Sequence, residues 1–106
     1  MNEISVADFK KLQDARDPHT LLDVREADEL AIASIPGALW IPMSEVPHRL
    51  SELPNDRQII VMCHLGARSA RITAFLNASG YPAAVNLSGG IHAWSLAVDA
   101  SVPVYD

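Results

Sequence analysis

The chain has little cysteine, few basic residues and no long apolar run. Its one cysteine, Cys63, excludes an internal disulfide, an intramolecular resolving thiol and a thiolate-rich metal site. The 8 Lys and Arg residues stand against 13 Asp and Glu residues, and the net charge of -5 has the wrong sign for binding nucleic acid or an anionic membrane. No apolar run approaches the roughly 18 residues that span a bilayer. We therefore expect neither nucleic acid nor a membrane among the partners.

Histidine is also sparse, and its spacing does not match a zinc site. The four residues lie far apart, so only folding of the chain can bring them together as metal ligands. We expect no metal, and we interpret three of these residues as surface or capped side chains: His19, His48 and His92. The first residues lack the positive region and apolar segment of a secretory signal, which predicts a cytoplasmic protein.

Enough apolar sequence is present to form a hydrophobic core. Apolar residues make up 49% of the chain and charged residues 20%, which is close to the average for soluble proteins and excludes intrinsic disorder. The length of 106 residues fits one domain of ordinary size but not two. We expect a single domain over residues 1–106.

Short apolar runs alternate with amphipathic segments along the chain. Predicted strands cover residues 20–24, 38–41, 59–62 and 84–87. Predicted helices cover residues 6–16, 27–31, 44–53, 68–79 and a last segment after residue 90. The tail from residue 102 carries no signal. This alternation predicts an α/β fold with a mostly parallel central sheet flanked by helices on both faces.

Capping residues and spacing give these elements finer detail. Ser5 is predicted to cap the first helix and Ser44 the third, with Pro47 in the first turn of the third helix. Helical spacing predicts that small and aromatic side chains form the inward face of the fourth helix: Ala70, Ala74, Phe75 and Ala78. Trp40 and Trp94 are interpreted as core residues.

The strongest predicted strand, residues 59–62, ends directly before Cys63. Its continuous, β-branched apolar sequence is typical of a central parallel strand covered on both faces. Ligands of such folds gather outside the carboxyl ends of the strands, where helix N-termini also point. The sequence therefore places Cys63 at the predicted ligand-binding edge of the sheet.

Residues 63–69 join this strand to the next helix, so their backbone must turn sharply. Gly66 supplies the conformational freedom for the turn, and unpaired amides at the helix N-terminus converge near Cys63. Such amides stabilise a thiolate or a developing oxyanion more than the helix dipole alone does. A lone cysteine after an apolar strand is also typical of a small buried hydrophobe, so these residues leave catalysis and structure equally open.

Four separated motifs run along nearly the whole chain. They are residues 21–26 (LLDVRE), 35–38 (IPGA), 63–69 (CHLGARS) and 87–90 (LSGG), the last followed by Trp94. Each motif is weak alone, but their order and spacing together are specific. In these motifs the chain resembles the single-domain rhodaneses, the sulfurtransferase family, so we expect a rhodanese-like domain.

The resemblance implies an enzyme that moves sulfane sulfur and needs no metal or organic cofactor. Cys63 is then the nucleophile, which takes sulfur from thiosulfate or another persulfide source and passes it to cyanide, a thiol or a sulfur-carrier protein. By the same resemblance the substrate is bound by the rest of the loop: His64, Leu65, Gly66, Ala67, Arg68 and Ser69.

Loop length distinguishes this activity from related ones. Cysteine phosphatases and arsenate reductases resemble the arrangement but have five residues between cysteine and arginine, whereas four separate Cys63 from Arg68. The smaller loop suits one sulfur atom better than phosphate or arsenate. A further alternative is a non-catalytic rhodanese-like binding or regulatory module, which the retained Cys63 and complete loop disfavour.

Two departures from the family leave the choice of donor open. The loop lacks the Lys or Arg of several thiosulfate-using members, and its one titratable group besides the thiol and Arg68 is His64. His64 either charges and attracts an anion or is an exposed loop residue, and we favour the second. Ser34 stands where the family often has a histidine, with little expected catalytic consequence.

Three charged residues near the loop each have two interpretations. Arg68 binds an anionic donor, or it pins the loop by donating to backbone carbonyls or to an acid, and its place at the helix start favours pinning. Asp23 and Arg25 end a neighbouring strand, where they either support the site from behind the loop or form a structural ion pair.

Overall fold

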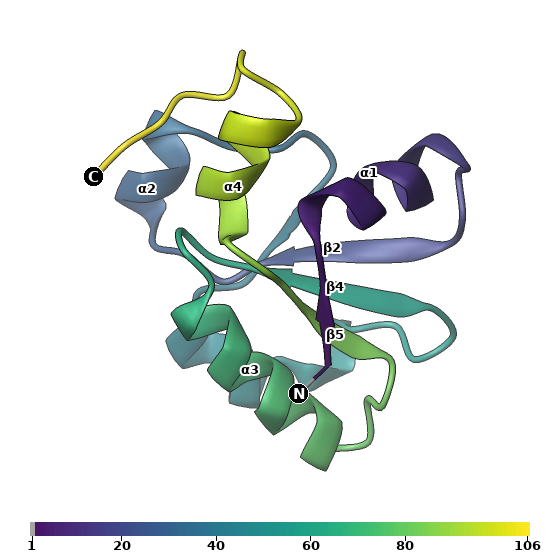
Figure 1. Ribbon diagram of the computed structural model, residues 1–106. Helices are drawn as coiled ribbons and strands as arrows, with labels where there is room; N and C mark the ends of the chain where they lie inside the picture. Colours follow the sequence, from purple (N-terminus) through teal and green to yellow (C-terminus); the bar gives the residue numbers. More distant parts are fainter. Residues whose placement is uncertain (1) are drawn as a thin grey trace.

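Five strands form one parallel sheet in the order β1-β5-β4-β2-β3 (Figure 1). They are β1 (Glu3–Ile4), β2 (His19–Asp23), β3 (Leu39–Trp40), β4 (Gln58–Met62) and β5 (Ala84–Leu87). The computed structural model describes residues 2–106. The predicted α/β fold is confirmed, and so is the central position of the strand that precedes Cys63. The two-residue β1 is too short to leave a periodic signal and was not predicted.

Helices cover both faces of the sheet. They are α1 (Val6–Asp14), α2 (Ala27–Ile32), α3 (Ala67–Ala78) and α4 (Gly90–Ala97). Two short 3-10 helices, η1 (Met43–His48) and η2 (Leu50–Glu52), follow β3. Figure 1 shows α3 on one side of the sheet and α1, α2 and α4 on the other. The sheet is therefore the middle layer of three, as the predicted flanking on both faces requires.

The core consists of two apolar clusters, one on each face of the sheet. Strand β4 contributes to both because successive side chains of a strand point to opposite faces. Ile59 and Val61 belong to the cluster that contains α3, whereas Ile60 and Met62 belong to the cluster that contains α1 and α4. By the same alternation Cys63 lies on the α3 face.

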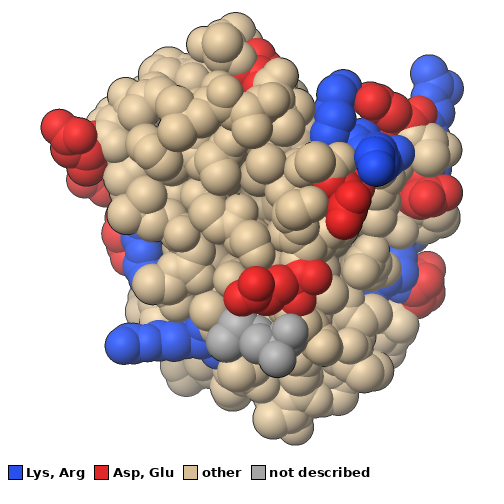
Figure 2. Space-filling model, viewed as in Figure 1, with Lys and Arg blue, Asp and Glu red and all other residues tan. Residues whose placement is uncertain are grey.

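Helix α1 begins as predicted. The Ser5 side chain accepts a hydrogen bond of 3.1 Å from the amide of Asp8, which is an N-cap. The helix ends at Asp14, earlier than predicted, because Arg16 has a left-handed backbone with φ of 56° that no helix can continue. Charged side chains gather at the upper right of Figure 2, over the region of α1. On this helix Lys10 pairs with Asp14 at 2.7 Å.

The prediction of one α-helix over residues 44–53 is wrong. The segment forms η1 and η2, and their amides bond three residues back, as in the bond from Glu45 to Pro42. Ser44 makes no capping bond. Pro47 has no amide to donate and restricts the residue before it, which opposes a regular α-helix here.

The predicted inward face of α3 is also wrong. Ala74, Ala78 and Phe75 are exposed, and Ala70 is half-buried. The helix instead buries the opposite set: Ser69, Ile72, Thr73 and Leu76. The reason lies at the helix start, where Ser69 turns its amide and hydroxyl toward Cys63 and so sets the rotation of the whole helix.

The two tryptophans differ in their surroundings. Trp94 is buried in the core, as predicted. Trp40 is exposed, because β3 lies at the edge of the sheet, and its indole donates a hydrogen bond of 2.8 Å to the carbonyl of Arg25. The core prediction for Trp40 is therefore wrong. Among residues 2–106, no helix has the length and apolar character that crossing a bilayer requires.

Candidate active site

Cys63 lies directly after β4, and only 1% of its surface is exposed. Its Sγ accepts hydrogen bonds from the amides of Gly66 at 3.1 Å and Ser69 at 3.4 Å. The Ser69 hydroxyl lies 3.2 Å from the same sulfur. Backbone dipoles aimed at one atom stabilise negative charge there. The groups within hydrogen-bond distance of the sulfur are thus neutral amides and a hydroxyl.

Gly66 makes the turn that brings these amides together. Its φ of 110° lies in the left-handed region, which side chains disfavour. A Cβ at this position lies 3.3 Å from the backbone nitrogen of Gly89. Gly66 therefore has both the backbone freedom and the close backbone approach that the sequence predicted, and α3 begins at the next residue.

Asn86 of β5 holds the loop from the neighbouring strand. Its side-chain oxygen accepts a hydrogen bond of 2.5 Å from Ser69 Oγ, and its Nδ2 donates to the Gly66 carbonyl at 3.3 Å. Only 4% of its surface is exposed. We call Gly66, Ser69 and Asn86 the cradle. All of its polar groups are neutral, and they fix both sides of the turn around Cys63.

The N-terminus of α4 contacts the backbone of the same loop. The amides of Ile91 and His92 donate to the carbonyls of Cys63 at 3.0 Å and His64 at 3.1 Å. Gly90 lies so near that a Cβ on it would be 2.4 Å from the His64 oxygen. The last of the four sequence motifs thus has a physical role, because its second glycine lets α4 approach the loop.

Arg68 does not point to Cys63 but to α2. Its two terminal nitrogens donate to the two carboxylate oxygens of Glu29 at 2.7 and 2.9 Å. These hydrogen bonds, together with others to the carboxylate, hold the pKa of Glu29 at about 2, and they raise the pKa of Arg68. The structure thus contains a contact between Arg68 and an acid, as the interpretation that Arg68 pins the loop requires.

Tyr105, in the C-terminal tail, completes this ion pair. Its hydroxyl donates to Glu29 at 2.7 Å and accepts from Arg25 at 3.0 Å. Burial raises its pKa to about 12, so the hydroxyl stays protonated and able to donate. We call Glu29, Arg68 and Tyr105 the clamp. The tail, which carried no signal in the sequence, therefore contributes to the surroundings of the loop.

His64 also contacts the tail. Its Nε2 lies 2.9 Å from the Tyr105 carbonyl, and because a carbonyl only accepts, this nitrogen carries the hydrogen. The two rings stack with centroids 4.0 Å apart, and the His92 ring meets the His64 ring edge-on. His64 is half-buried, so its interpretation as an exposed loop residue is wrong.

Asp23 and Arg25 form a buried ion pair with an Nη2 to Oδ2 distance of 2.7 Å. Arg25 also donates to the carbonyl of Ala33 at 2.8 Å. The pair connects to the clamp through Tyr105, whose hydroxyl accepts from Arg25, and through the Glu29 carbonyl, which accepts from Arg25 at 3.4 Å. Both interpretations from the sequence therefore hold in part, since a structural ion pair also supports the clamp.

The predicted substrate loop divides into three groups by orientation. Gly66 and Ser69 face Cys63. Arg68 faces Glu29, and His64 faces the C-terminal tail. The other two residues are exposed: Leu65 and Ala67. Sequence reasoning missed three contributors, namely Glu29, Asn86 and Tyr105. Of these, Asn86 left a signal, because a polar residue inside an apolar strand must find a partner.

His19 and His48 make no contact described for the loop, whereas His92 meets the loop through His64. His48 is exposed, and His19 is bonded to the Asp17 carbonyl at 2.8 Å, as expected for surface or capped residues. His92 is half-buried, and within residues 2–106 its Nδ1 has no hydrogen-bond partner. The interpretation of His92 as a surface or capped residue is therefore wrong. In the same described residues, no three His, Cys, Asp or Glu side chains are grouped to hold a metal ion.

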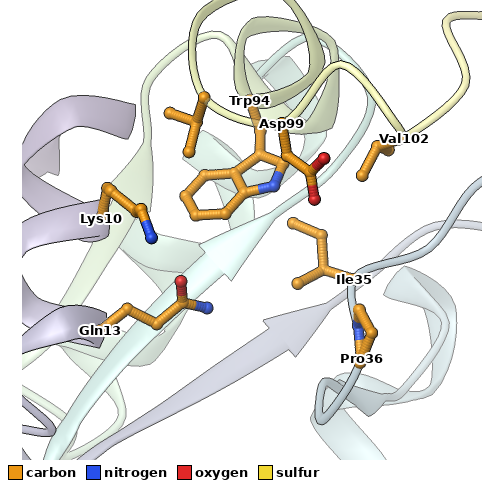
Figure 3. A pocket seen from close by; sticks show the side chains of 8 residues that line it. Lys10, Gln13, Ile35, Pro36, Trp94, Asp99 and Val102 are labelled. Carbon is orange, nitrogen blue, oxygen red and sulfur yellow. The ribbon is translucent and has the colours of Figure 1, made fainter.

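A cavity of about 340 Å³ lies at a different place in the fold (Figure 3). Lys10 and Gln13 of α1, Ile35 and Pro36, and Trp94 of α4 form much of its wall. None of the predicted site residues contributes to this wall. The cavity is therefore separate from the Cys63 loop.

These features define a class of protein: an α/β domain whose central strand presents a cysteine to backbone amides at the start of a helix. The family model described as "Rhodanese-like domain" matches residues 5–97. The chain therefore belongs to the rhodanese-like domain family, and the resemblance seen in its motifs is confirmed.

Individual relatives agree with this assignment. A protein named "Sulfurtransferase" from Allochromatium vinosum is 42% identical over 96 residues, which cover 90% of this chain and 89% of the relative. The crystal structure of a rhodanese-like domain protein from Staphylococcus aureus superposes with a TM-score of 0.85 at 32% identity and covers 100% of both chains. Some relatives are longer: the chain matches only 34% of a rhodanese-like/PpiC domain-containing chloroplastic protein from Arabidopsis thaliana, at 38% identity.

Proposed function

We propose that this protein is a sulfurtransferase that carries sulfane sulfur as a persulfide on Cys63. The donor is thiosulfate or another persulfide source, and the acceptor is a thiol, cyanide or a sulfur-carrier protein. The observation that carries this proposal is the pair of amides, from Gly66 and Ser69, directed at a single cysteine sulfur. A relative named "Sulfurtransferase" that matches nearly its whole length supports the same activity.

The reaction has two steps that balance without an oxidant. In the first, the Cys63 thiolate, having lost its proton to solvent, attacks the outer sulfur of the donor. The sulfur–sulfur bond of the donor breaks, and with thiosulfate the leaving group is sulfite. In the second, the acceptor attacks the outer sulfur of the persulfide and regenerates the thiolate. Both steps begin or end with negative charge on Cys63 Sγ, where the amides point.

The loop residues take different roles in this scheme. The amides of Gly66 and Ser69 contact the reacting sulfur, while His64, Leu65 and Ala67 form the outer part of the substrate-binding loop. Arg68 holds the loop through Glu29 in this scheme, because the two parallel hydrogen bonds of its terminal nitrogens direct the guanidinium to that carboxylate. Asp23 and Arg25 support the loop from behind, through Tyr105.

The alternatives are weaker on the same observations. A phosphatase or arsenate reductase has to hold a tetrahedral anion, but Arg68 is bonded to Glu29 and the loop is one residue shorter than in those enzymes. A non-catalytic binding or regulatory module has no need of amides directed at a thiol. The geometry around Cys63 therefore favours sulfur transfer over both.

Intact mass measurement tests the proposal directly. The protein is incubated with thiosulfate, freed of excess donor and weighed, and a gain of about 32 Da is expected from one bound sulfur. Cyanide should remove the added mass, and the Cys63→Ser variant should never gain it. A protein that gains no mass from thiosulfate or from cysteine persulfide is not a sulfurtransferase. Hydrolysis of an aryl phosphate that is lost in Cys63→Ser would favour the phosphatase instead.

A further inference from the structure

The C-terminal tail ends beside α2, on the far side of α4 from the strands (Figure 1). Tyr105 is the residue of this tail that joins two separate parts of the site. Its hydroxyl contacts Glu29 and Arg25, while its ring and carbonyl contact His64 in the Cys63 loop. These contacts go beyond what filling a space in the core requires.

We propose that Tyr105 is a positioning residue of the active site, which acts on Cys63 by fixing the loop from its outer side. The first path runs through Glu29. This carboxylate accepts four hydrogen bonds, two from Arg68, one from Tyr105 and one from the amide of Glu26, so the tyrosine helps to fix the carboxylate that in turn fixes Arg68. Hydrogen bonds to a charged group are stronger than those between neutral groups.

Arg68 passes this constraint to the sulfur, because it belongs to the first turn of α3. The next residue, Ser69, donates its amide to Cys63 Sγ. A shift of Arg68 therefore shifts one of the two amides on which the proposed chemistry depends. A misplacement of about 1 Å in such a group can reduce turnover about a hundredfold.

The second path runs through His64, the residue that follows Cys63. Tyr105 accepts from its Nε2 at 2.9 Å and stacks on its ring, so both the tautomer and the plane of the imidazole are fixed by the tail. The carbonyl of His64 is held at the same time by the amide of His92. Tyr105 thus limits the movement of the loop at its beginning as well as at Arg68.

Three variants separate positioning from ordinary packing. Tyr105→Phe removes the hydroxyl and keeps the stacked ring, whereas Tyr105→Ala removes both. Tyr81→Phe is the matched control, since its hydroxyl makes a hydrogen bond of the same kind, at 2.8 Å to the Leu50 carbonyl, remote from the loop. Val104→Ala is the control for the tail itself, because 53% of Val104 is exposed.

Two measurements that need no sulfur transfer come first. In Tyr105→Ala, we expect faster amide hydrogen exchange in residues 63–69 and an alkylation rate of Cys63 by iodoacetamide that rises about fivefold or more, because the buried sulfur becomes accessible. Tyr105→Phe should show a smaller rise of the same sign. Tyr81→Phe and Val104→Ala should keep wild-type rates even if their melting temperatures fall.

The third measurement is turnover, and this readout alone rests on the proposed function. We expect kcat for sulfur transfer from thiosulfate to cyanide to fall about tenfold in Tyr105→Ala, with KM changed less than about twofold, because a loosened loop misplaces the amides without removing a donor-binding group. Wild-type exchange and alkylation rates in Tyr105→Ala would overturn the positioning role. If the wild-type protein shows no turnover, the proposed function is overturned instead. The exchange and alkylation rates then decide the positioning role by themselves.

Discussion

The cradle and the clamp hold the same short loop by opposite physical means. The cradle consists of neutral groups, and its side chain Asn86 is 4% exposed. The clamp consists of an ion pair in which the Glu29 side chain is 15% exposed and that of Arg68 is 34% exposed. The cradle lies against the Cys63 sulfur, and the clamp lies at the outer end of the loop.

This difference separates stabilisation of charge from placement of the loop. Neutral buried hydrogen bonds are insensitive to salt and to pH, so the cradle offers Cys63 the same surroundings over a wide range of conditions. A partly exposed ion pair is weakened by solvent and salt, so we expect the clamp to contribute less than the cradle to the free energy of unfolding. The variants below alter the contact of α4 with the loop, then the cradle, and then the clamp.

The largest effect is expected where α4 touches the backbone of the loop. In Gly90→Ala the new Cβ would lie 2.4 Å from the His64 oxygen and 2.5 Å from the Cys63 oxygen, and neither backbone atom can yield cheaply. We expect the free energy of unfolding to fall by about 3 kcal/mol or more, measured by urea denaturation. Gly80→Ala is the control, since its φ is also positive but no atom lies within 4 Å of the new Cβ. Equal losses in the two variants would mean that crowding against the loop is unimportant.

A smaller but more specific effect is expected from the polar side chain of the cradle. Asn86→Ala removes the nearest acceptor of the Ser69 hydroxyl and one of the donors to the Gly66 carbonyl, which should cost about 2 kcal/mol of stability and lower kcat at least about tenfold. Asn77→Ala removes three hydrogen bonds from another part of α3. That control should lose stability while retaining kcat. If both variants lose kcat alike, the effect comes from general destabilisation.

The clamp should respond to pH where the cradle does not. Glu29 has a pKa of about 2 in place of the ordinary 4.5, so its carboxylate adds stability above pH 4.5 that is lost as the pH falls toward 2. After allowance for solvent screening, we expect Glu29→Gln to be about 1 to 2 kcal/mol less stable than wild type at pH 7. This difference should shrink on acidification below pH 4.5, whereas the deficit of Asn86→Ala should not. A constant deficit for Glu29→Gln would contradict the assignment of the ion pair.

The smallest change keeps the charge of the clamp and alters its shape. Arg68→Lys replaces a planar fork that meets both oxygens of Glu29 by a single ammonium group, which should cost about 1 kcal/mol and lower kcat in a way that more donor does not restore. Arg49→Lys changes a similar fork on Glu52, away from the loop, and should leave kcat unchanged. An increase in KM alone for Arg68→Lys would show that Arg68 binds the donor.

The cradle was predictable from the sequence to a greater extent than the clamp. An apolar β-branched strand, a cysteine at its end and a glycine before a helix are local signals, and they placed Cys63, Gly66 and the start of α3 correctly. Tyr105 and Glu29 are 76 residues apart, and no local pattern connects them. Contacts of this kind depend on how the finished layers pack, which short-range periodicity does not contain.

The errors inside single elements have a similar origin. Helical spacing predicted which residues of α3 share a face, but the face that turns inward is set by the contact of Ser69 with Cys63, which belongs to the loop. In η1 and η2 a proline and short-range hydrogen bonds prevailed over an amphipathic pattern. Local sequence thus predicted the types of most elements, and tertiary contacts decided their orientation.

The order of the chain has a consequence for synthesis. Asn86, Gly90 and Tyr105, which contact the loop or its ion pair, all follow Cys63 in the sequence. Strand β1 pairs with β5, so that Glu3 and Ser88, 85 residues apart, share a hydrogen bond. A ribosome releases Cys63 before any of these partners, and contacts between distant segments are slow to form. We therefore expect the newly made thiol to stay more accessible to oxidants until residues 86–105 have emerged.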